Sequence, residues 1–256
     1  MFNRRDIVYL YDGSFDGLLC AIFECYNSHE IPVSIEENNN VQQGLFLEYK
    51  IILTDEKKAR RVSDAVSSKI SRISLTNLYY AYLSDAENKE IACLEYVITG
   101  FHFGSSVNSR LAIDCVSQIR DAVKRVKNEA HQYLGFVRFR ELEGGIFYSE
   151  INPKCNILPA ISKHFQRRFS NMPWIIYDKI HALCLVYNGK SCCLTPVEYT
   201  PNIKLSEDEL KYEHFWKTFY NTIEIKERHN ERCRMTHMPK RFWENLIEMQ
   251  EDKTCL

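Results

Sequence analysis

The sequence has little net charge, few glycines and prolines, and no long apolar segment. Its 33 basic and 34 acidic residues give a formal net charge of −1, and it has nine glycines and seven prolines in 256 residues. This composition excludes collagen-like, low-complexity and strongly polycationic chains. No apolar stretch approaches the roughly 18 residues that a membrane-spanning helix needs, and the start lacks a signal-peptide pattern. We therefore expect a cytoplasmic protein with no membrane partner.

Several motifs of metal, nucleotide and hydrolase sites are also missing. None of the ten cysteines forms a C-x-x-C pair, and no H-E-x-x-H, P-loop, G-x-G-x-x-G or G-x-S-x-G motif occurs. The C-x-x-x-C-x-x-C triplet of radical SAM enzymes is absent as well. Free cysteine behaves as a small buried apolar residue in a reducing compartment, so we expect reduced thiols. The residues predict no bound metal and no cofactor.

The N-terminal half is expected to be rich in helices. Residues 6–11 and 45–53 predict strands, because they are rich in β-branched and aromatic residues. Ser14, and then Thr54 or Asp55, are the expected helix N-caps. Gly104-Ser105-Ser106 is the candidate hinge, which gives regions 1–105 and 106–256, with one continuous domain as the alternative. Apolar residues at helical spacing predict helices at residues 15–26, 55–72, 76–84, 87–100 and 109–133.

In the C-terminal half the pattern changes to short strands. We expect a hairpin at Glu143-Gly144-Gly145, where two glycines tolerate the positive φ of a tight turn, and a capping box formed by Ser206 and Glu209. The strands are expected at residues 135–141, 146–151, 174–178, 181–187 and 191–198, and the helices at 156–169, 206–228 and 239–250. The sequence thus predicts an α+β fold, with a helix-rich N-terminal half and a mostly antiparallel sheet with packed helices in the C-terminal half.

The small net charge conceals an uneven distribution of charge. The first fifty residues hold three basic and eight acidic side chains, whereas residues 151–200 hold six basic and two acidic ones. Residues 226–241 form another basic cluster. Arg138 and Arg140 alternate along a predicted strand, so both side chains are expected on one face. Aromatic residues are interleaved with these cations.

Phosphate contacts combined with aromatic stacking hold single-stranded or flipped nucleotides. These features predict a nucleic-acid surface, and the alternative is a set of merely solvated helix faces. The candidate nucleic-acid-binding residues are Arg138, Arg140, Lys154, Arg167, Arg168, Lys226, Arg228, Arg232, Arg234, His237, Lys240, Arg241 and Trp243.

The segment from Glu150 to Lys154 is the main candidate for chemistry. Metal-dependent nucleases use a strand-borne carboxylate to hold a divalent ion and a lysine to stabilise developing charge. The spacing here differs from the usual E-x-K pattern, and Pro153 indicates more simply the end of a strand. Glu150, Lys154 and His164 are the candidate catalytic residues, and the sequence leaves open whether the protein is an enzyme.

Five segments carry a family resemblance. They are YLYDGSFDGLL at 9–19, EAHQYLGFVRF at 129–139, YSEINPK at 148–154, FWKTFY at 215–220 and HMPKRFW at 237–243. In this order they resemble a bacterial domain family of unknown function whose members are labelled DNA metabolism proteins, and the resemblance covers nearly the whole chain. The chain has Cys155 where we expect His in that family, so no catalytic or metal role is carried over to this position.

The resemblance implies a role in DNA repair or DNA modification. Members of that family are encoded beside a radical SAM protein, and some are fused to a uracil-DNA-glycosylase-like domain; this chain is similar to the unfused form. We therefore expect an accessory protein that binds DNA and works with a radical SAM partner. One alternative is a DNA-processing enzyme of the glycosylase or nuclease type. The other is an interaction scaffold without nucleic-acid binding, whose acidic first fifty residues dock a basic partner.

Overall fold

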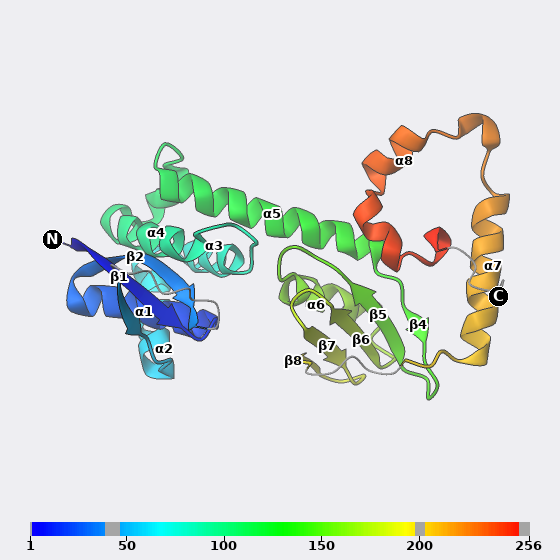
Figure 1. Cartoon of the computed structure of the whole chain (residues 1–256), viewed down its shortest axis with the longest axis horizontal. Helices are drawn as coiled ribbons and strands as arrows, with labels where there is room; N and C mark the ends of the chain where they lie inside the picture. Colours follow the sequence, from blue (N-terminus) through cyan, green and yellow to red (C-terminus); the bar gives the residue numbers. More distant parts are fainter. Residues whose placement is uncertain (1, 39–46, 198–202, 251–256) are drawn as a thin grey trace. The chain divides into compact units, whose positions relative to one another are not determined.

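The computed structural model describes residues 2–38, 47–197 and 203–250, and the side chain of Lys226 lies outside this description. The chain divides into two compact units, residues 1–126 and 127–256, with the boundary inside helix α5 (Asp114–Phe136). The two units are therefore taken one at a time (Figure 1). The division expected at residue 105, with one continuous domain as its alternative, stays a prediction. No helix in the described ranges is long and apolar enough to cross a bilayer.

A three-stranded parallel sheet organises unit 1. Its central strand β1 (Asn3–Tyr11) pairs with β2 (Glu30–Glu37) on one side and with β3 (Glu48–Ile51) on the other. The last five residues of β1 are all buried, as expected for a parallel strand covered on both faces. The predicted strand at 6–11 is confirmed. The strand predicted over 45–53 is shorter than expected within its described part, where β3 covers only Glu48–Ile51. Strand β2 was not predicted.

Helices pack around this sheet and confirm the expected helix-rich character. They are α1 (Phe15–Ser28), α2 (Glu56–Ala65), the π-helical turn η2 (Val66–Ile70), α3 (Arg72–Tyr82), α4 (Lys89–Phe103), the 3₁₀ segment η3 (Gly104–Ser109) and the first part of α5. The expected caps are present: Ser14 Oγ accepts a hydrogen bond from Gly17 N, and Asp55 Oδ1 accepts one from Lys57 N. The long helix expected over 55–72 is interrupted by η2, which periodicity alone does not reveal.

Unit 2 contains a five-stranded sheet in the order β4-β5-β6-β7-β8. The strands are β4 (Arg140–Glu141), β5 (Phe147–Ile151), β6 (Trp174–Asp178), β7 (Leu183–Tyr187) and β8 (Cys192–Pro196). All neighbouring pairs are antiparallel except β5 and β6, which run parallel. Helix α6 (Leu158–Arg168) connects those two strands and packs against β7 and β8. The α+β architecture, with a mostly antiparallel second sheet, is therefore confirmed.

The glycine hairpin forms where it was expected. Gly144 and Gly145 have φ of +99° and +76°, and Leu142 N donates to Ile146 O across the turn. The strand predicted before it, over 135–141, is wrong in most of its length. Helix α5 continues to Phe136, because Tyr133 and the turn around it pack into unit 2, and only residues 140–141 join the sheet.

The C-terminal region differs most from the prediction. Helix α7 (Glu207–Thr222) starts as expected, but the single helix over 239–250 is wrong. The 3₁₀ turns η5 (Lys240–Asn245) and η6 (Ile247–Met249) stand there, because extended Leu246 is fully buried and separates them. The remaining elements are the short turn η4 (Lys226–Arg228) and helix α8 (Glu231–His237), which was not expected as a separate helix.

Only one of the two hydrogen bonds of the capping box predicted at α7 is present. Ser206 Oγ accepts from Glu209 N at 3.1 Å, as predicted. The Glu209 carboxylate does not return to the cap amide: it accepts a hydrogen bond from Glu141 N at 2.9 Å, while Ser206 N donates to Glu141 O. Burial raises the pKa of Glu209. This carboxylate therefore links the start of α7 to the edge strand β4.

Candidate nucleic-acid interface

A buried carboxylate joins three segments of unit 2. Glu129 of α5 is 5% exposed and accepts hydrogen bonds from the backbone amides of Lys154 at 3.1 Å and Cys155 at 2.8 Å. Its Oε1 also lies 3.1 Å from Arg241 Nη1, and Arg241 Nη2 donates to Gln132 Oε1 at 2.6 Å. These bonds tie the loop after β5 and the turn η5 to α5. Arg241 thus has an internal partner.

Aromatic packing strengthens the same junction. Phe242 is 2% exposed and lies against Tyr133, with ring centroids 5.0 Å apart, and against Phe136 at 4.5 Å. Burial, together with the nearby charge of Glu129, raises the pKa of Tyr133. Three of the five segments that carry the family resemblance, 129–139, 148–154 and 237–243, therefore meet at one place in unit 2.

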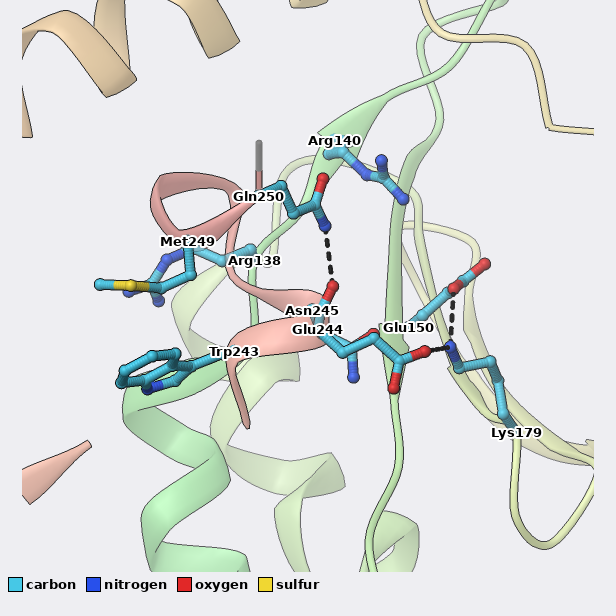
Figure 2. Close-up of a pocket in the computed structure, with 9 residues that line it drawn as sticks. All are labelled: Arg138, Arg140, Glu150, Lys179, Trp243, Glu244, Asn245, Met249 and Gln250. Atoms are coloured by element: carbon cyan, nitrogen blue, oxygen red, sulfur yellow. Dashed lines mark hydrogen bonds and ion pairs between the residues drawn. The ribbon is translucent and has the colours of Figure 1, made fainter. Parts of the chain in front are cut away.

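An open cavity of about 640 Å³ lies beside this junction. Figure 2 shows its lining, which comes from β4 and the residues just before it, from β5, from the residue that follows β6, and from the C-terminal turns. The lining residues are Arg138, Arg140, Glu150, Lys179, Trp243, Glu244, Asn245, Met249 and Gln250. The cavity combines cations, carboxylates and one large aromatic ring, so its chemistry suits a polar ligand with a planar part.

A lysine between two carboxylates occupies one side of the cavity. Lys179 Nζ lies 3.4 Å from Glu150 Oε2 and 2.9 Å from Glu244 Oε1 (Figure 2). Burial lowers the pKa of Lys179, but the hydrogen bond from Lys179 to Glu244 and the charge of Glu150 outweigh it, so the net shift is upward. Tyr148 Oη donates to Glu150 Oε1 at 3.1 Å, and burial together with the Glu150 charge raises the Tyr148 pKa.

The two arginines of the cavity also face carboxylates. Arg138 Nη2 lies 2.8 Å from Glu248 Oε1, with Arg138 26% and Glu248 3% exposed. Burial alone raises the pKa of Glu248, but hydrogen bonds, led by the one from Arg138, lower it overall. Trp216 Nε1 donates to the same carboxylate at 3.2 Å. Arg140 has a looser pair with Glu213 at 3.8 Å. Both predicted contacts therefore line the cavity, but both are partly neutralised.

Helix α6 presents a contrasting set of cations. Its four basic side chains are exposed, and none forms an ion pair with a residue that the structure describes. They stand in two rows at i and i+4 spacing, so they share one side of the helix. The guanidinium of Arg168 lies 5.7 Å from the ring of Phe169. Lys163, Arg167 and Arg168 are called the α6 cations below, and His164 is the fourth basic residue of the helix.

The cations near the C-terminus divide into two groups. Arg234 pairs with Glu231 at 2.6 Å, and both Arg234 and Lys240 lie over the Trp243 ring, at 5.0 and 5.6 Å. Trp243 Nε1 donates to Met238 O at 2.9 Å, which fixes the indole. Exposed side chains without an ion pair among the described residues are Lys154, Arg228, Arg232 and His237. Lys226 lies outside the residues whose side chains are described.

The predicted catalytic residues separate in the structure. Glu150 lines the cavity, whereas Lys154 and His164 do not. The backbone amide of Lys154 is instead bound to the Glu129 carboxylate. Sequence reasoning missed Lys179 and Glu244. The parallel pairing that sets Ile151 opposite Asp178 brings the ends of β5 and β6 together, and nothing local in the sequence indicated that pairing.

The described residues hold no group of three or more His, Cys, Asp or Glu side chains arranged to bind a metal ion. None of the nine cysteines in the described ranges is in a disulfide bond, and Cys255 lies outside those ranges. Six of the nine are buried, in keeping with small apolar residues in a core.

Comparison with known proteins adds a family but no activity. A search of curated proteins returns no match. The family model for a domain of unknown function, DUF4130, matches residues 87–248, which include four of the five segments singled out from the sequence. The match covers more than half of the chain, and it includes the buried Glu129 junction and seven of the nine residues that line the cavity beside it, all but Met249 and Gln250. The chain therefore belongs to the DUF4130 family of domains of unknown function.

Proposed function

We propose that this protein binds DNA through unit 2 and acts as an accessory protein in DNA metabolism. The observation that carries the proposal is the unpaired state of the α6 cations. Arg138, Arg234 and Arg241 are held by carboxylates of their own unit, whereas Arg167 and Arg168 are exposed on a helix without acidic residues. Unpaired, exposed cations contribute phosphate contacts at little desolvation cost.

The cavity supports a more specific role in the same proposal. Trp243 gives a rigid aromatic wall. Arg140 stands at the lining with only a loose pair to Glu213, whereas Arg138 adds positive charge there although it already donates to Glu248 and to the carbonyls of Gly135 and Val137. An unstacked nucleotide needs such a combination, a plane for the base and cations for its phosphates. We propose that phosphates contact α6 and that the cavity receives one nucleotide.

A charge-reversal variant tests the DNA-binding proposal. Arg167→Glu/Arg168→Glu changes two exposed side chains and leaves the Glu129 junction intact. We expect affinity for a fluorescein-labelled single strand to fall at least tenfold at low salt, measured by anisotropy. The control Lys57→Glu/Arg60→Glu carries the same change of charge in unit 1, and its affinity for the labelled strand should fall far less. Equal losses in both variants would contradict a role for α6.

Enzymatic activity at the cavity is a second candidate, favoured by the Glu150–Lys179–Glu244 arrangement. A carboxylate beside an ammonium group can exchange a proton with a bound substrate. We expect any turnover of damaged DNA to disappear in Glu150→Gln, with DNA affinity retained. Incubation of labelled substrates with the purified chain, with and without Mg²⁺, measures this. Turnover unchanged in Glu150→Gln would remove the cavity from consideration as the reaction site.

A docking role toward a radical SAM partner rests on a different feature. Helix α7 exposes several large apolar side chains after its acidic, capped first turn. They are Leu210, Tyr212, Phe215, Trp216 and Phe219. Exposed apolar patches of this kind mark protein–protein contacts. The family resemblance names the radical SAM protein as the partner that we propose for this face.

Co-purification after nuclease treatment tests the docking role. Phe215→Ser/Phe219→Ser should release the partner, whereas Asn221→Ala on the same helix should retain it. Retention by the double variant would exclude α7 as the contact.

A further inference from the structure

Another groove lies in unit 1, and its lining contains no residue assigned to a function above. It has a volume of about 390 Å³ and is formed by α1, α2, the π-helical turn η2 and α4. Its lining residues are Phe23, Tyr26, Arg61, Val62, Ala65, Lys69 and Phe101. None of them was a candidate site residue in the sequence analysis. The groove therefore needs its own explanation.

Three aromatic rings form the floor of the groove. Phe23 and Tyr26 come from α1 and Phe101 from α4, and all three pack against the core of unit 1 while remaining partly exposed. The rings of Tyr26 and Phe101 are nearly perpendicular, at 86°, with centroids 5.6 Å apart. Core packing on one side fixes these rings, so they give the groove a rigid apolar floor that a planar group can contact.

Three cations from α2 and η2 lie over rings of this floor, and two of them, Arg61 and Lys69, line the groove. Lys58 Nζ and the Arg61 guanidinium each lie 5.6 Å from the Phe23 ring centroid, and Lys69 Nζ lies 5.9 Å from that of Phe101. None of the three forms an ion pair with any residue in the described ranges. The ring contacts hold the charges at the groove without neutralising them. They are therefore available to an anion.

Local backbone geometry places Lys69 at the groove. Helix α2 passes into the π-helical turn η2, in which Ser71 N donates to Val66 O at 3.1 Å. The turn packs closely on α4 at Gly100, where a Cβ would lie 2.5 Å from Ile70 Cδ1. That close approach brings the neighbouring Lys69 over Phe101. Single π-helical turns within helices are frequently found at functional sites.

We propose that this groove binds a nucleotide, with the base against Phe23, Tyr26 and Phe101 and the phosphate held by the lining residues Arg61 and Lys69, while Lys58 over Phe23 adds positive charge. A nucleotide joins a planar apolar group to an anion, and the groove offers a partner for each. A carboxylate side chain of an acidic peptide satisfies the cations but leaves the rings uncovered. The nucleotide is either part of a strand or free, and this inference does not depend on the α6 cations.

The test measures binding to the full chain in the Arg167→Glu/Arg168→Glu background, which removes the contribution proposed for α6. The probes are an eight-residue oligothymidylate, an abasic oligomer of equal length, thymidine monophosphate and an oligoglutamate peptide, each titrated calorimetrically. We expect the oligothymidylate to bind at least five times more tightly than the abasic oligomer. Adding Arg61→Ala/Lys69→Ala should weaken binding tenfold or more, whereas adding Lys57→Ala/Arg60→Ala, outside the groove on α2, should change it less than twofold.

Each outcome decides the inference. Monophosphate binding that is as tight as oligomer binding and is lost in Arg61→Ala/Lys69→Ala supports the groove as a site for a free nucleotide. Preference for the oligomer, lost in the same variant, supports a strand. Equal affinity for abasic and base-bearing oligomers, tighter binding of oligoglutamate, or no binding at all would overturn it. Phe23→Leu keeps the core apolar and should reduce only the base-dependent part of the affinity. These results are independent of whether wild-type binding falls on loss of the α6 cations.

Discussion

Single carboxylates decide which cations of unit 2 are available. Glu129 accepts two backbone amides and pairs with Arg241, and Glu248 pairs with Arg138 and accepts from Trp216. Both acids are separated in sequence from the arginines that they bind. From the sequence alone all the arginines looked equivalent, because a partner more than a hundred residues away leaves no local signal.

Loss of Glu129 should destabilise the protein through its backbone partners. Glu129→Ala leaves the amides of Lys154 and Cys155 without an acceptor in a buried place, so we expect the free energy of unfolding to fall by about 3 kcal/mol. Urea denaturation followed by tryptophan fluorescence measures this. Glu129→Gln keeps one acceptor oxygen, so its free energy of unfolding should fall by less. A loss below about 0.5 kcal/mol in Glu129→Ala would contradict the structural role of this residue.

The Glu248 pair predicts a pH dependence of stability. Its pKa is lower in the folded state than the ordinary value of 4.5, so the ionised carboxylate contributes stability above the unfolded pKa. That contribution is lost as the pH falls through the folded pKa. We expect Glu248→Gln to lose about 2 kcal/mol at pH 7 and to approach the wild type as the pH falls well below 4.5. A difference that is constant between pH 7 and pH 3 would be inconsistent with this pair.

At the scale of elements, local signals were read correctly and pairings were not. Ser14, Asp55 and Ser206 cap their helices as expected, because each cap depends on amides within a few residues. The interruption of α2 by η2 and the extended Leu246 between two 3₁₀ turns depend on packing partners elsewhere. The same limit applies to the candidate site. Glu150 was predicted, but Lys179 was not, because the parallel pairing of β5 and β6 that brings the two residues together has no local sequence signal.

The glycine hairpin gives a test at this scale. Gly144 has φ of +99° with open space around it, so Gly144→Ala meets only backbone strain. We expect it to lower the free energy of unfolding by about 1–2 kcal/mol. Gly135→Ala is the matched control: it also has open space, lies in helix α5, and should raise stability by up to about 1 kcal/mol. Equal effects in thermal melts would show that φ is not the cause.

For the whole molecule, net charge is a poor guide to the partner. The formal net charge is −1, yet the α6 cations in unit 2 and the cations of the aromatic groove in unit 1 stand without ion pairs among the described residues. What matters is which charges the fold leaves unpaired. Since the two sets belong to different units, their effects on binding should be separable by mutation.

The most direct measurement is the anisotropy of labelled single-stranded and duplex DNA with the full chain at two salt concentrations. Phosphate contacts release counterions, so we predict binding at 50 mM salt that weakens at least tenfold at roughly 200 mM. The same loss should follow from Arg167→Glu/Arg168→Glu at the lower salt. No binding at low salt, or binding that is insensitive to salt, would contradict the account that unpaired cations of this protein hold DNA.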